Sequence, residues 1–378
     1  MRTAPVDDAE NLLVALPNWV GDVVLATPVL AALRARFPAA RITFLTRTPL
    51  AEVVSGGGWH DEVVFWPDGS GLGKTLGLAR ELRSRGFDLA VLLPNSFRSA
   101  FVCRLAGIPR RVGYARDGRG WLLSDRLRPP KRDGVFIPTP MTPYYAELSR
   151  RVGAPVADQR LCLGVTPEQE LAGRTLLAHY GLDGGRPYAV LNPGAAFGAS
   201  KCWLPARFAE LADRLQAELR LPSVIVGAPG EAELMRDIAR RASSPVICCD
   251  NPGTTLGSLK VVIREAALLV CNDTGPRHYG NAFGVPTVTI FGPTDPAWTS
   301  GDYPAETCLR VAVECGPCQL PRCPLDHRCM VEMTTERVFL AARDALLRRG
   351  SRLAGSAPSR FAVGAAGELL LKGEDAAP

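Results

Sequence analysis

A short polar segment in the second half of the chain has the residue types of a phosphate-binding turn. It reads Asn272-Asp273-Thr274-Gly275, with His278 three residues further on, and an apolar run ends just before it. A strand that turns directly into a helix leaves backbone N–H groups unpaired at the helix start, where the helix dipole also favours an anion. Thr274 adds a hydroxyl donor, and Gly275 lets a ligand approach the backbone. The segment predicts a phosphate or diphosphate site; the alternative is an ordinary turn capped by Asp273.

Two further loops of the same half also follow apolar runs and can bind other parts of a nucleotide. The first contains Gly194, Ser200 and Lys201, and its small residues allow it to wrap a ligand. Lys201 offers a compact positive charge for a diphosphate oxygen, although a Gly-rich loop with an exposed lysine is the simpler interpretation. In the second loop, Glu231 can accept hydrogen bonds from ribose hydroxyls, or it can merely favour the start of a helix.

Asp22 is the candidate acid–base residue, and it lies in a turn after the first apolar run. The turn reads Pro17-Asn18-Trp19-Val20-Gly21-Asp22, and Gly21 permits a tight bend. A carboxylate held there can remove the proton from an acceptor hydroxyl while that oxygen attacks. The alternative is that Asp22 only caps the helix that runs through Pro28.

Composition indicates a soluble globular protein with more than one domain. The 378 residues are 47% apolar and 22% charged, and a chain of this length exceeds a single core. No run of about 18 uncharged apolar residues is present, so no membrane-spanning helix is expected. The N-terminus, Met1 to Glu10, carries acidic residues where a signal peptide has a basic and then an apolar region. We therefore expect the chain to remain in the cytoplasm.

Positive charge is concentrated in the first half of the chain. Between Arg98 and Arg132, only Asp117 and Asp125 oppose ten basic residues. Such a patch attracts a phosphorylated lipid, an acidic sugar or a nucleic acid, unless it is simply a solvated face. Aromatic residues are sparse there, which argues against binding of single-stranded nucleic acid. The ten are Arg98, Arg104, Arg110, Arg111, Arg116, Arg119, Arg126, Arg128, Lys131 and Arg132.

Short apolar runs alternate with helix-period segments in two series, which predicts an α/β protein with two parallel sheets. Two Rossmann-like domains facing each other across a cleft follow from this pattern. We expect the domains at 1–175 and 176–349, and a flexible tail at 350–378. The predicted strands are Leu12–Leu16, Ile42–Leu45, Val63–Phe65 and Leu89–Leu93 in the first series, and Tyr188–Leu191, Val224–Val226, Val246–Cys248, Leu268–Val270 and Val288–Phe291 in the second.

Taken together, these segments resemble a known family, the ADP-heptose:lipopolysaccharide heptosyltransferases of glycosyltransferase family 9. The resemblance covers nearly the whole chain, from about Asn11 to Leu347, and is greatest to the heptosyltransferase II branch. It implies the GT-B fold. The matching segments are Pro17–Asp22, Leu93–Ala100, Asn192–Ala195 through Lys201–Trp203, and Asn272–Gly275 with His278.

The resemblance implies an inverting transfer of L-glycero-D-manno-heptose from ADP-heptose to the inner core of lipopolysaccharide. Asp22 matches the general base, and Lys201 the residue that neutralises the departing diphosphate. Glu231 matches the carboxylate on the donor's ribose. The basic patch would then lie against the acceptor and the anionic inner face of the inner membrane, and no nucleic acid is expected. The implied donor residues are Gly194, Ser200, Glu231, Asp273, Thr274, Gly275 and His278, and the implied acceptor residues are Asn18, Asn95, Ser96 and Arg98. We add Arg111 to the acceptor residues because it belongs to the basic patch.

Two other functions remain open from the residues. A related enzyme with the same fold can use another nucleotide sugar, such as a UDP-hexose. A metal-stabilised binding protein without activity is the third interpretation, although the full set of Asp22, Lys201, Asp273 and His278 argues against it. Binding of ADP against UDP separates the first two functions.

The cysteines form a separate feature. Cys315, Cys318, Cys323, His327 and Cys329 gather five soft ligands in a short stretch of a chain with eleven cysteines. Disulfides are not expected in the cytoplasm, so a structural zinc site is chemically reasonable, an iron–sulfur site less so, and metal-free cysteines bracing a loop are the alternative. Catalysis itself should need no metal, because the chain has no Asp-x-Asp pair to hold one on a nucleotide sugar.

Overall fold

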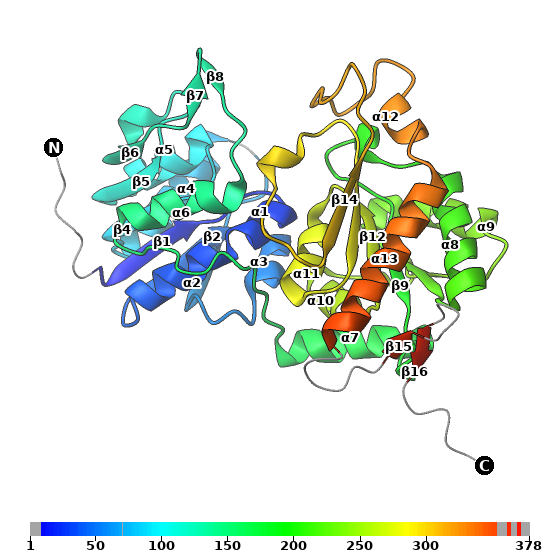
Figure 1. Ribbon diagram of the computed structural model, residues 1–378. Coiled ribbons are helices and arrows are strands. Elements are labelled where there is room, and N and C mark those ends of the chain that lie inside the picture. Colours follow the sequence, from blue (N-terminus) through cyan, green and yellow to red (C-terminus); the bar gives the residue numbers. More distant parts are fainter. Residues whose placement is uncertain (1–8, 70, 354–360, 364–368, 372–378) are drawn as a thin grey trace. The chain divides into compact units, whose positions relative to one another are not determined.

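The computed structural model describes residues 9–69, 71–353, 361–363 and 369–371, and it divides the chain into two units (Figure 1). Unit 1 comprises residues 1–164 and 297–302, and unit 2 comprises the rest. The predicted boundary at residue 175 falls inside helix α7 (Pro167–His179), which lies whole in unit 2. Most of the tail expected at 350–378 lies outside the described residues.

Unit 1 is built on a six-stranded sheet in the order β3-β2-β1-β4-β5-β6, and every neighbouring pair is parallel. Its central strands are apolar and buried because helices cover both faces. All four predicted strands are present, and β5 and β6 were not expected. The strands are β1 (Asn11–Ala15), β2 (Arg41–Thr46), β3 (Glu62–Phe65), β4 (Leu89–Leu92), β5 (Arg110–Tyr114) and β6 (Asp125–Leu127), and a separate hairpin pairs β7 (Lys131–Arg132) with β8 (Val135–Phe136).

The helices of unit 1 form two groups. One group packs on a cluster that includes Leu13 and Leu45 of the sheet, through residues such as Leu82 and Cys103. The members of the other group pack on one another, α2 on α6 and α1 on α3. The first group is α4 (Leu72–Ser84) and α5 (Phe97–Leu105), and the second is α1 (Val20–Leu25), α2 (Thr27–Arg36), α3 (Thr48–Val54) and α6 (Met141–Arg151).

Unit 2 repeats the same strand order, β11-β10-β9-β12-β13-β14, again with parallel pairs throughout. All five predicted strands are present, and β14 was not expected. The strands are β9 (Ala189–Asn192), β10 (Ser223–Ile225), β11 (Val246–Cys248), β12 (Leu268–Asn272), β13 (Thr287–Phe291) and β14 (Glu306–Arg310). Beyond them, β15 (Phe361–Val363) and β16 (Leu369–Leu371) form an antiparallel pair.

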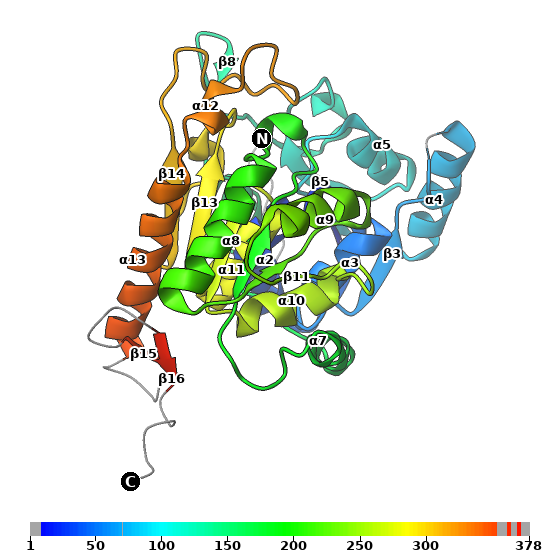
Figure 2. The ribbon, with the colours of Figure 1, turned by 90° about the vertical axis from the view of Figure 1, so that its right-hand side faces the viewer.

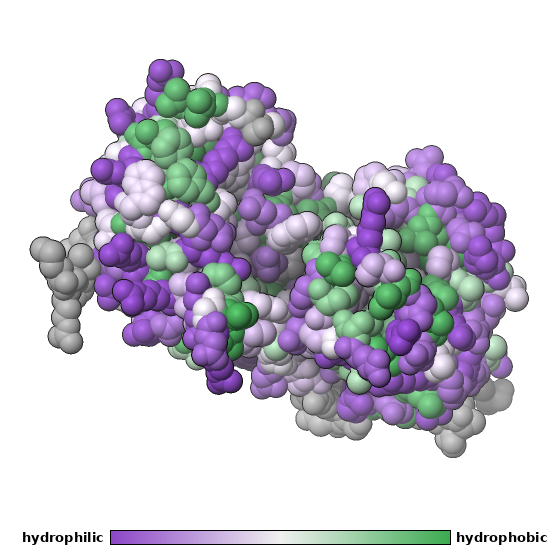
Figure 3. Space-filling model, turned by 90° about the horizontal axis from the view of Figure 1, so that it is seen from above, coloured by the Kyte–Doolittle hydropathy of each residue, from purple (hydrophilic) through white to green (hydrophobic). Residues whose placement is uncertain are grey.

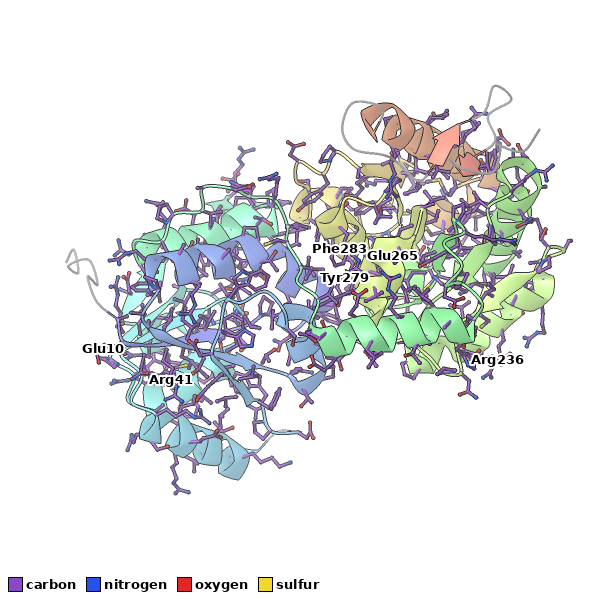
Figure 4. All side chains as sticks on the ribbon, turned by 90° about the horizontal axis from the view of Figure 1, so that it is seen from below. Glu10, Arg41, Arg236, Glu265, Tyr279 and Phe283 are labelled. Atoms are coloured by element: carbon purple, nitrogen blue, oxygen red, sulfur yellow. The ribbon has the colours of Figure 1, made fainter. Side chains whose placement is uncertain are left out.

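The core of unit 2 lies between its sheet and three helices, which Figure 2 shows on one side of the sheet. Trp203, Phe208 and Phe339 are its largest side chains. On the other side α7 packs on α10, and α10 on α11; Figure 4 shows Glu265 at the end of α10 and Tyr279 on α11 above helix α7. The core helices are α8 (Pro205–Leu219), α9 (Ala232–Arg241) and α13 (Thr335–Leu353), and the others are α10 (Leu256–Glu265) and α11 (Gly275–Phe283).

The shared strand order determines where polar loops gather. In each sheet the order reverses between two strands, β1 and β4 in unit 1 and β9 and β12 in unit 2. Ligands of doubly wound sheets bind at the carboxyl ends of the strands that flank such a reversal. The structure therefore points to the loops after these strands. None of the helices in the described ranges combines the length and apolar character of a membrane span.

Candidate functional site

The loops after β9 and β12 are joined by an ion pair between Lys201 and Asp273. Lys201 Nζ donates to the Asp273 carboxylate at 2.6 Å and to the Asp273 carbonyl oxygen at 3.0 Å. Both side chains are largely buried, with 13% and 8% of their surface exposed. The structure thus brings together Lys201, the predicted cation of one loop, and Asp273, the acidic residue of the predicted phosphate turn.

Asp273 has further partners, two of which the sequence analysis did not identify as site residues. Thr294 donates to its carboxylate at 2.7 Å, and Arg277 does so at 3.3 Å. Burial raises the pKa of Asp273, but the charges of Lys201 and Arg277 outweigh burial and hold it below its usual value. Asp273 is therefore ionised. It does not cap α11, because the N-cap residue is Thr274, so the simpler interpretation of this turn is wrong.

Arg277 extends this network to Glu306 on β14. Its guanidinium, 1% exposed, donates to both oxygens of the Glu306 carboxylate. Asn281 and Thr289 donate to the same carboxylate at 3.1 and 2.6 Å. Arg277 follows Asp273 by four residues, and this spacing at the start of a helix could have predicted the Asp273–Arg277 ion pair. Nothing in the sequence indicated Glu306, because its strand was not expected.

The start of α11 offers one backbone donor. Within the described part of unit 2, Thr274 occupies the N-cap without a capping bond from its side chain, and the helix begins at Gly275. Pro276 has no N–H, and the Arg277 N–H donates to the Thr274 carbonyl oxygen at 3.2 Å. The Gly275 N–H, beside the buried cation Lys201, is therefore the donor that this helix start presents to an anion. His278 lies one turn further on, and burial followed by the charge of Arg277 lowers its pKa to about 3. It is therefore neutral at neutral pH, and its buried Nδ1 has no hydrogen-bond partner among the described residues.

The structure also brings Gly194 and Glu231 together. A Cβ placed at Gly194 would meet the Glu231 carboxylate at 2.0 Å, so only glycine leaves room for that side chain. The carboxylate accepts a hydrogen bond from the Ala228 backbone N–H at 2.8 Å, which folds it back over its own loop. The loops after β9 and β10 thus meet at a half-buried carboxylate.

Ser200 is placed differently from the other predicted donor residues. It is buried, and its hydroxyl donates to the Leu320 carbonyl oxygen at 2.5 Å. Its backbone N–H donates to the Pro321 carbonyl oxygen at 3.2 Å. Ser200 therefore fixes the segment before Lys201 to the cysteine-containing loop.

In unit 1, Asp22 lies in the first turn of α1, directly after β1. The helix begins at Val20, so Asp22 does not cap it, contrary to the simpler interpretation. Its side chain is half-buried, while Asn18 just before the helix is exposed. Burial and then the negative charge of Asp22 raise the pKa of Tyr145, which places this phenol within electrostatic reach of the carboxylate.

The turn after β4 carries Asn95 and Ser96. Strand β4 lies beside β1, at the point where the strand order of unit 1 reverses. Ser96 caps α5 by accepting the Ser99 backbone N–H at 3.2 Å. Asn95 Oδ1 accepts from the Tyr144 hydroxyl at 3.3 Å. Arg119, fully buried, donates to the carbonyl oxygens of Pro94 and Ser96, and burial lowers its pKa to about 10. Sequence analysis counted Arg119 only as surface charge, yet it holds this turn in place.

The two arginines expected to bind an acceptor differ. Arg98 is half-buried, with its guanidinium over the Trp66 ring at 5.2 Å. Arg111 is only 6% exposed, and it donates to the carbonyl oxygens of Ile108, Pro109 and Leu122. Burial, followed by the charge of Arg104, lowers its pKa. Arg111 therefore stabilises unit 1 internally, and we remove it from the acceptor-binding set.

Comparisons with known proteins agree with this arrangement. Residues 75–328 match Glycosyltransferase family 9 (heptosyltransferase). The chain is 30% identical to lipopolysaccharide heptosyltransferase 2 of Salmonella typhimurium, over 76% of this chain and 84% of that protein. The solved Escherichia coli ADP-heptose lipopolysaccharide heptosyltransferase II is similar with a TM-score of 0.74 and 25% identity, over 90% and 99% of the two chains. A family 9 glycosyltransferase from Veillonella parvula shares the fold, with a TM-score of 0.76 and 22% identity over 90% and 98%.

The family match at 75–328 includes the loops after β4, β9, β10 and β12, whereas β1 and Asp22 lie before it. The fold is the two-sheet GT-B arrangement of heptosyltransferases, and the chain is an enzyme. The chain belongs to glycosyltransferase family 9, the heptosyltransferases of lipopolysaccharide core biosynthesis.

Proposed function

We propose that the enzyme transfers L-glycero-D-manno-heptose from ADP-heptose to the inner core of lipopolysaccharide, with inversion at the anomeric carbon. The observation that carries the proposal is the buried Lys201–Asp273 pair beside the open N-terminus of α11. This is an anion site at the strand reversal of unit 2. Two of the relatives named above are lipopolysaccharide heptosyltransferases, and one of these is described as an ADP-heptose enzyme.

The donor is assigned to unit 2. The diphosphate binds at Lys201 and the Gly275 N–H at the start of α11, next to Thr274. Glu231 accepts hydrogen bonds from the ribose hydroxyls with its carboxylate, which the Ala228 N–H holds and for which Gly194 leaves room. Neutral His278 lies near the sugar or the phosphate.

The acceptor is assigned to unit 1. Asp22 is the general base, because it is the half-buried carboxylate after β1, with exposed Asn18 beside it. Asn95 and Ser96 lie after β4, the other strand of the reversal. Arg98 supplies positive charge for the acidic groups of the acceptor. Arg119 positions the turn that carries Asn95 and Ser96, since it binds their neighbouring carbonyl oxygens.

The reaction is a single displacement. The acceptor oxygen attacks the anomeric carbon from the face opposite the diphosphate and gives its proton to Asp22, while the bond to the phosphate oxygen breaks. ADP departs with the bonding electrons, and Lys201 and the helix N-terminus stabilise the developing charge. Donors held in place before the reaction begins need no reorganisation during it. We propose that no metal takes part in this step, and expect added Mg²⁺ or Mn²⁺ to leave the rate unchanged.

The acceptor is a membrane lipid, so we also propose that unit 1 docks on the anionic inner face of the inner membrane from the cytoplasm. Lys131 and Arg132 of the β7–β8 hairpin are exposed, next to Val135, which is 70% exposed. In Figure 3 a group of hydrophobic residues of unit 1 is bordered by hydrophilic ones. Basic residues attract anionic lipid, and apolar side chains insert at its surface.

Sedimentation with liposomes tests the docking. Vesicles with anionic lipid should retain the protein at low salt and release it at high salt, because salt screens the charges. A double change, Lys131→Ser with Arg132→Ser, should weaken retention, and the exposed pair Glu233→Ser with Glu210→Ser on unit 2 serves as a control. Equal retention of all three proteins would contradict the docking surface.

The transfer itself is tested with purified protein, ADP-heptose and an inner-core acceptor that lacks the heptose. Release of ADP should match a gain of one heptose in the acceptor's mass. No transfer, together with a thermal shift by UDP and none by ADP, would move the function to another nucleotide sugar. No shift by either nucleotide would favour the binding protein without activity.

A further inference from the structure

The loop between β14 and α12 (Arg328–Val331) gathers cysteines around one small cavity of unit 2, outside the proposed catalytic residues. Cys315, Cys318, Cys323 and Cys329 all line this cavity. None of them is in a disulfide: each is a free thiol. Cys315, Cys318 and Cys323 lie in the loop and Cys329 lies on α12, so the fold, and not the sequence spacing alone, places them around one cavity.

The backbone of the loop contacts one of these sulfurs directly. The Leu325 N–H donates to Cys323 Sγ at 3.4 Å, which fixes the position of this side chain. His327, which the sequence also indicated as a ligand, has another partner, because its Nε2 lies 2.8 Å from the Ser200 carbonyl oxygen.

The four side chains surround the cavity without yet converging. Among the described residues, no three His, Cys, Asp or Glu side chains are arranged as a ready set of metal ligands. Binding therefore requires rotation of thiols toward the cavity. Cys329 is buried and belongs to the core of unit 2. Cys315 is exposed and Cys318 and Cys323 are half-buried, so these three thiols can rotate toward Cys329 without disturbing the core.

The same loop is attached to the segment that carries Lys201. Ser200 binds it three times, through the Leu320 and Pro321 carbonyl oxygens and through His327. Just before, a Cβ at Gly198 would meet the Pro321 carbonyl oxygen at 2.2 Å, so the two backbones are in close contact. Anything that rigidifies the cysteine loop therefore also holds the segment before Lys201.

We propose that Cys315, Cys318, Cys323 and Cys329 bind one zinc ion, and that this ion holds the loop against which Ser200 and Lys201 are positioned. Four thiolates suit Zn²⁺ in a closed tetrahedral site, and each thiol that binds releases its proton. The role is structural, since all four positions on the metal are occupied by the protein. The zinc site itself stands without the proposed function; only its effect on Lys201 rests on that function.

Metal content of the full-length protein tests the site directly. Protein purified without chelators should contain about one zinc per chain, as structural sites do. The double variant Cys318→Ser/Cys323→Ser should contain almost none, while the control Cys248→Ser, on β11 of the same unit, should match the wild type. Protein that contains no zinc and takes up none from added Zn²⁺, or a double variant that retains it, overturns the site. An iron–sulfur absorption spectrum would overturn the choice of zinc.

The link to Lys201 needs a separate measurement. In the transfer assay the double variant should lose about 10- to 100-fold in kcat, the usual effect of removing groups that support a site from outside. Its affinity for the acceptor should not change. If the wild type itself transfers no heptose, the proposed function fails but the metal content still decides the zinc site. A zinc-free variant with full kcat would overturn the positioning role.

Discussion

Units 1 and 2 have the same strand order, but they hold their site residues in different ways. In unit 2, Lys201, Asp273, Arg277 and Glu306 form one continuous chain of buried ion pairs. In unit 1, the proposed base Asp22 is half-buried on the short helix α1, and the nearby turn is held by Arg119 through backbone carbonyl oxygens. One site is thus part of the core of its unit, and the other lies at its surface.

This difference fits what each half is proposed to bind. A diphosphate needs positive charge that is already in place, and the Asp273 carboxylate holds the Lys201 ammonium in position at 2.6 Å. A general base instead needs access to a hydroxyl that arrives with the acceptor. We therefore expect changes at the site of unit 2 to affect both stability and activity, and changes at Asp22 to affect activity alone.

The largest effect should come from Asp22→Asn. The change keeps the size of the side chain and removes the base, so kcat should fall by about 10²- to 10⁴-fold. Affinity for the donor and the melting temperature should remain those of the wild type. The control is Asp117→Asn, at an exposed position with φ of 53°, a conformation that asparagine tolerates. Turnover equal to that of the wild type would remove Asp22 from its role, and a large loss of stability would contradict the comparison of the units.

Arg277→Met should have the largest effect on stability. It leaves Glu306 buried without its main cation, which costs about 3–5 kcal/mol in the free energy of unfolding. Adding Glu306→Gln should recover part of that loss, because the unpaired charge disappears. Arg236→Met is the control: Arg236 lies at the surface of unit 2 (Figure 4), 52% exposed and paired with Asp250, so its loss should cost at most about 1 kcal/mol. Urea denaturation gives the free energy of unfolding of the wild type and the three variants. Equal midpoints would contradict a stabilising role of the buried ion pairs.

Lys201→Met should affect both properties, and activity more. Removing a cation from the leaving group should lower kcat by about 10²- to 10³-fold. The loss of stability should be smaller than for Arg277→Met, since Asp273 keeps its bonds to Arg277 and Thr294. Lys201→Arg should recover part of the rate, and Lys131→Met, assayed with a soluble acceptor fragment, is the control. An unchanged rate in Lys201→Met would move the diphosphate away from this loop.

The sequence predicted the strands wherever they are apolar and missed them where they carry charge. All nine predicted strands exist, within about two residues at each end. Strand β5 begins with Arg110 and Arg111, and the sequence alone indicates exposed residues there. In the structure, backbone carbonyl oxygens accept hydrogen bonds from Arg111. Strand β14 begins with Glu306, whose burial depends on Arg277 from another element. Tertiary partners of this kind leave no trace in a local pattern.

The site residues divide in the same way. Asp22, Lys201 and Asp273 were predicted from their position in loops directly after apolar strands, and their roles stay predictions. Residues that support them from a distance, such as Arg119 and Glu306, were not. Arg111 was assigned to the acceptor for its charge, and its burial shows that charge without a position is a poor guide to a site.

The smallest effect we predict is a dependence of stability on pH that arises from His278 in unit 2. His278 is buried, and its pKa of about 3 in the folded protein lies below the value of 6.5 for an ordinary histidine. The unfolded chain therefore binds a proton between these values that the folded protein does not. Stability is fully present above pH 6.5 and is lost as the pH falls toward 3, with a slope of at most about 1.4 kcal/mol per pH unit.

His278→Gln should reduce this slope, because glutamine does not titrate, and should leave the contribution of His60 in unit 1, whose pKa burial also lowers. His179→Gln, at an exposed position on α7, should keep the slope of the wild type. The window from pH 6.5 to 5 is the informative one, since the carboxylates Asp273 and Glu306, whose pKa values lie below their usual ones, remain charged there. Free energies of unfolding in that window should thus separate the two histidine variants. If the slope of His278→Gln equals that of the wild type, the acid sensitivity arises elsewhere. The buried residues of unit 2 then contribute less to the stability of their unit than their ion pairs imply.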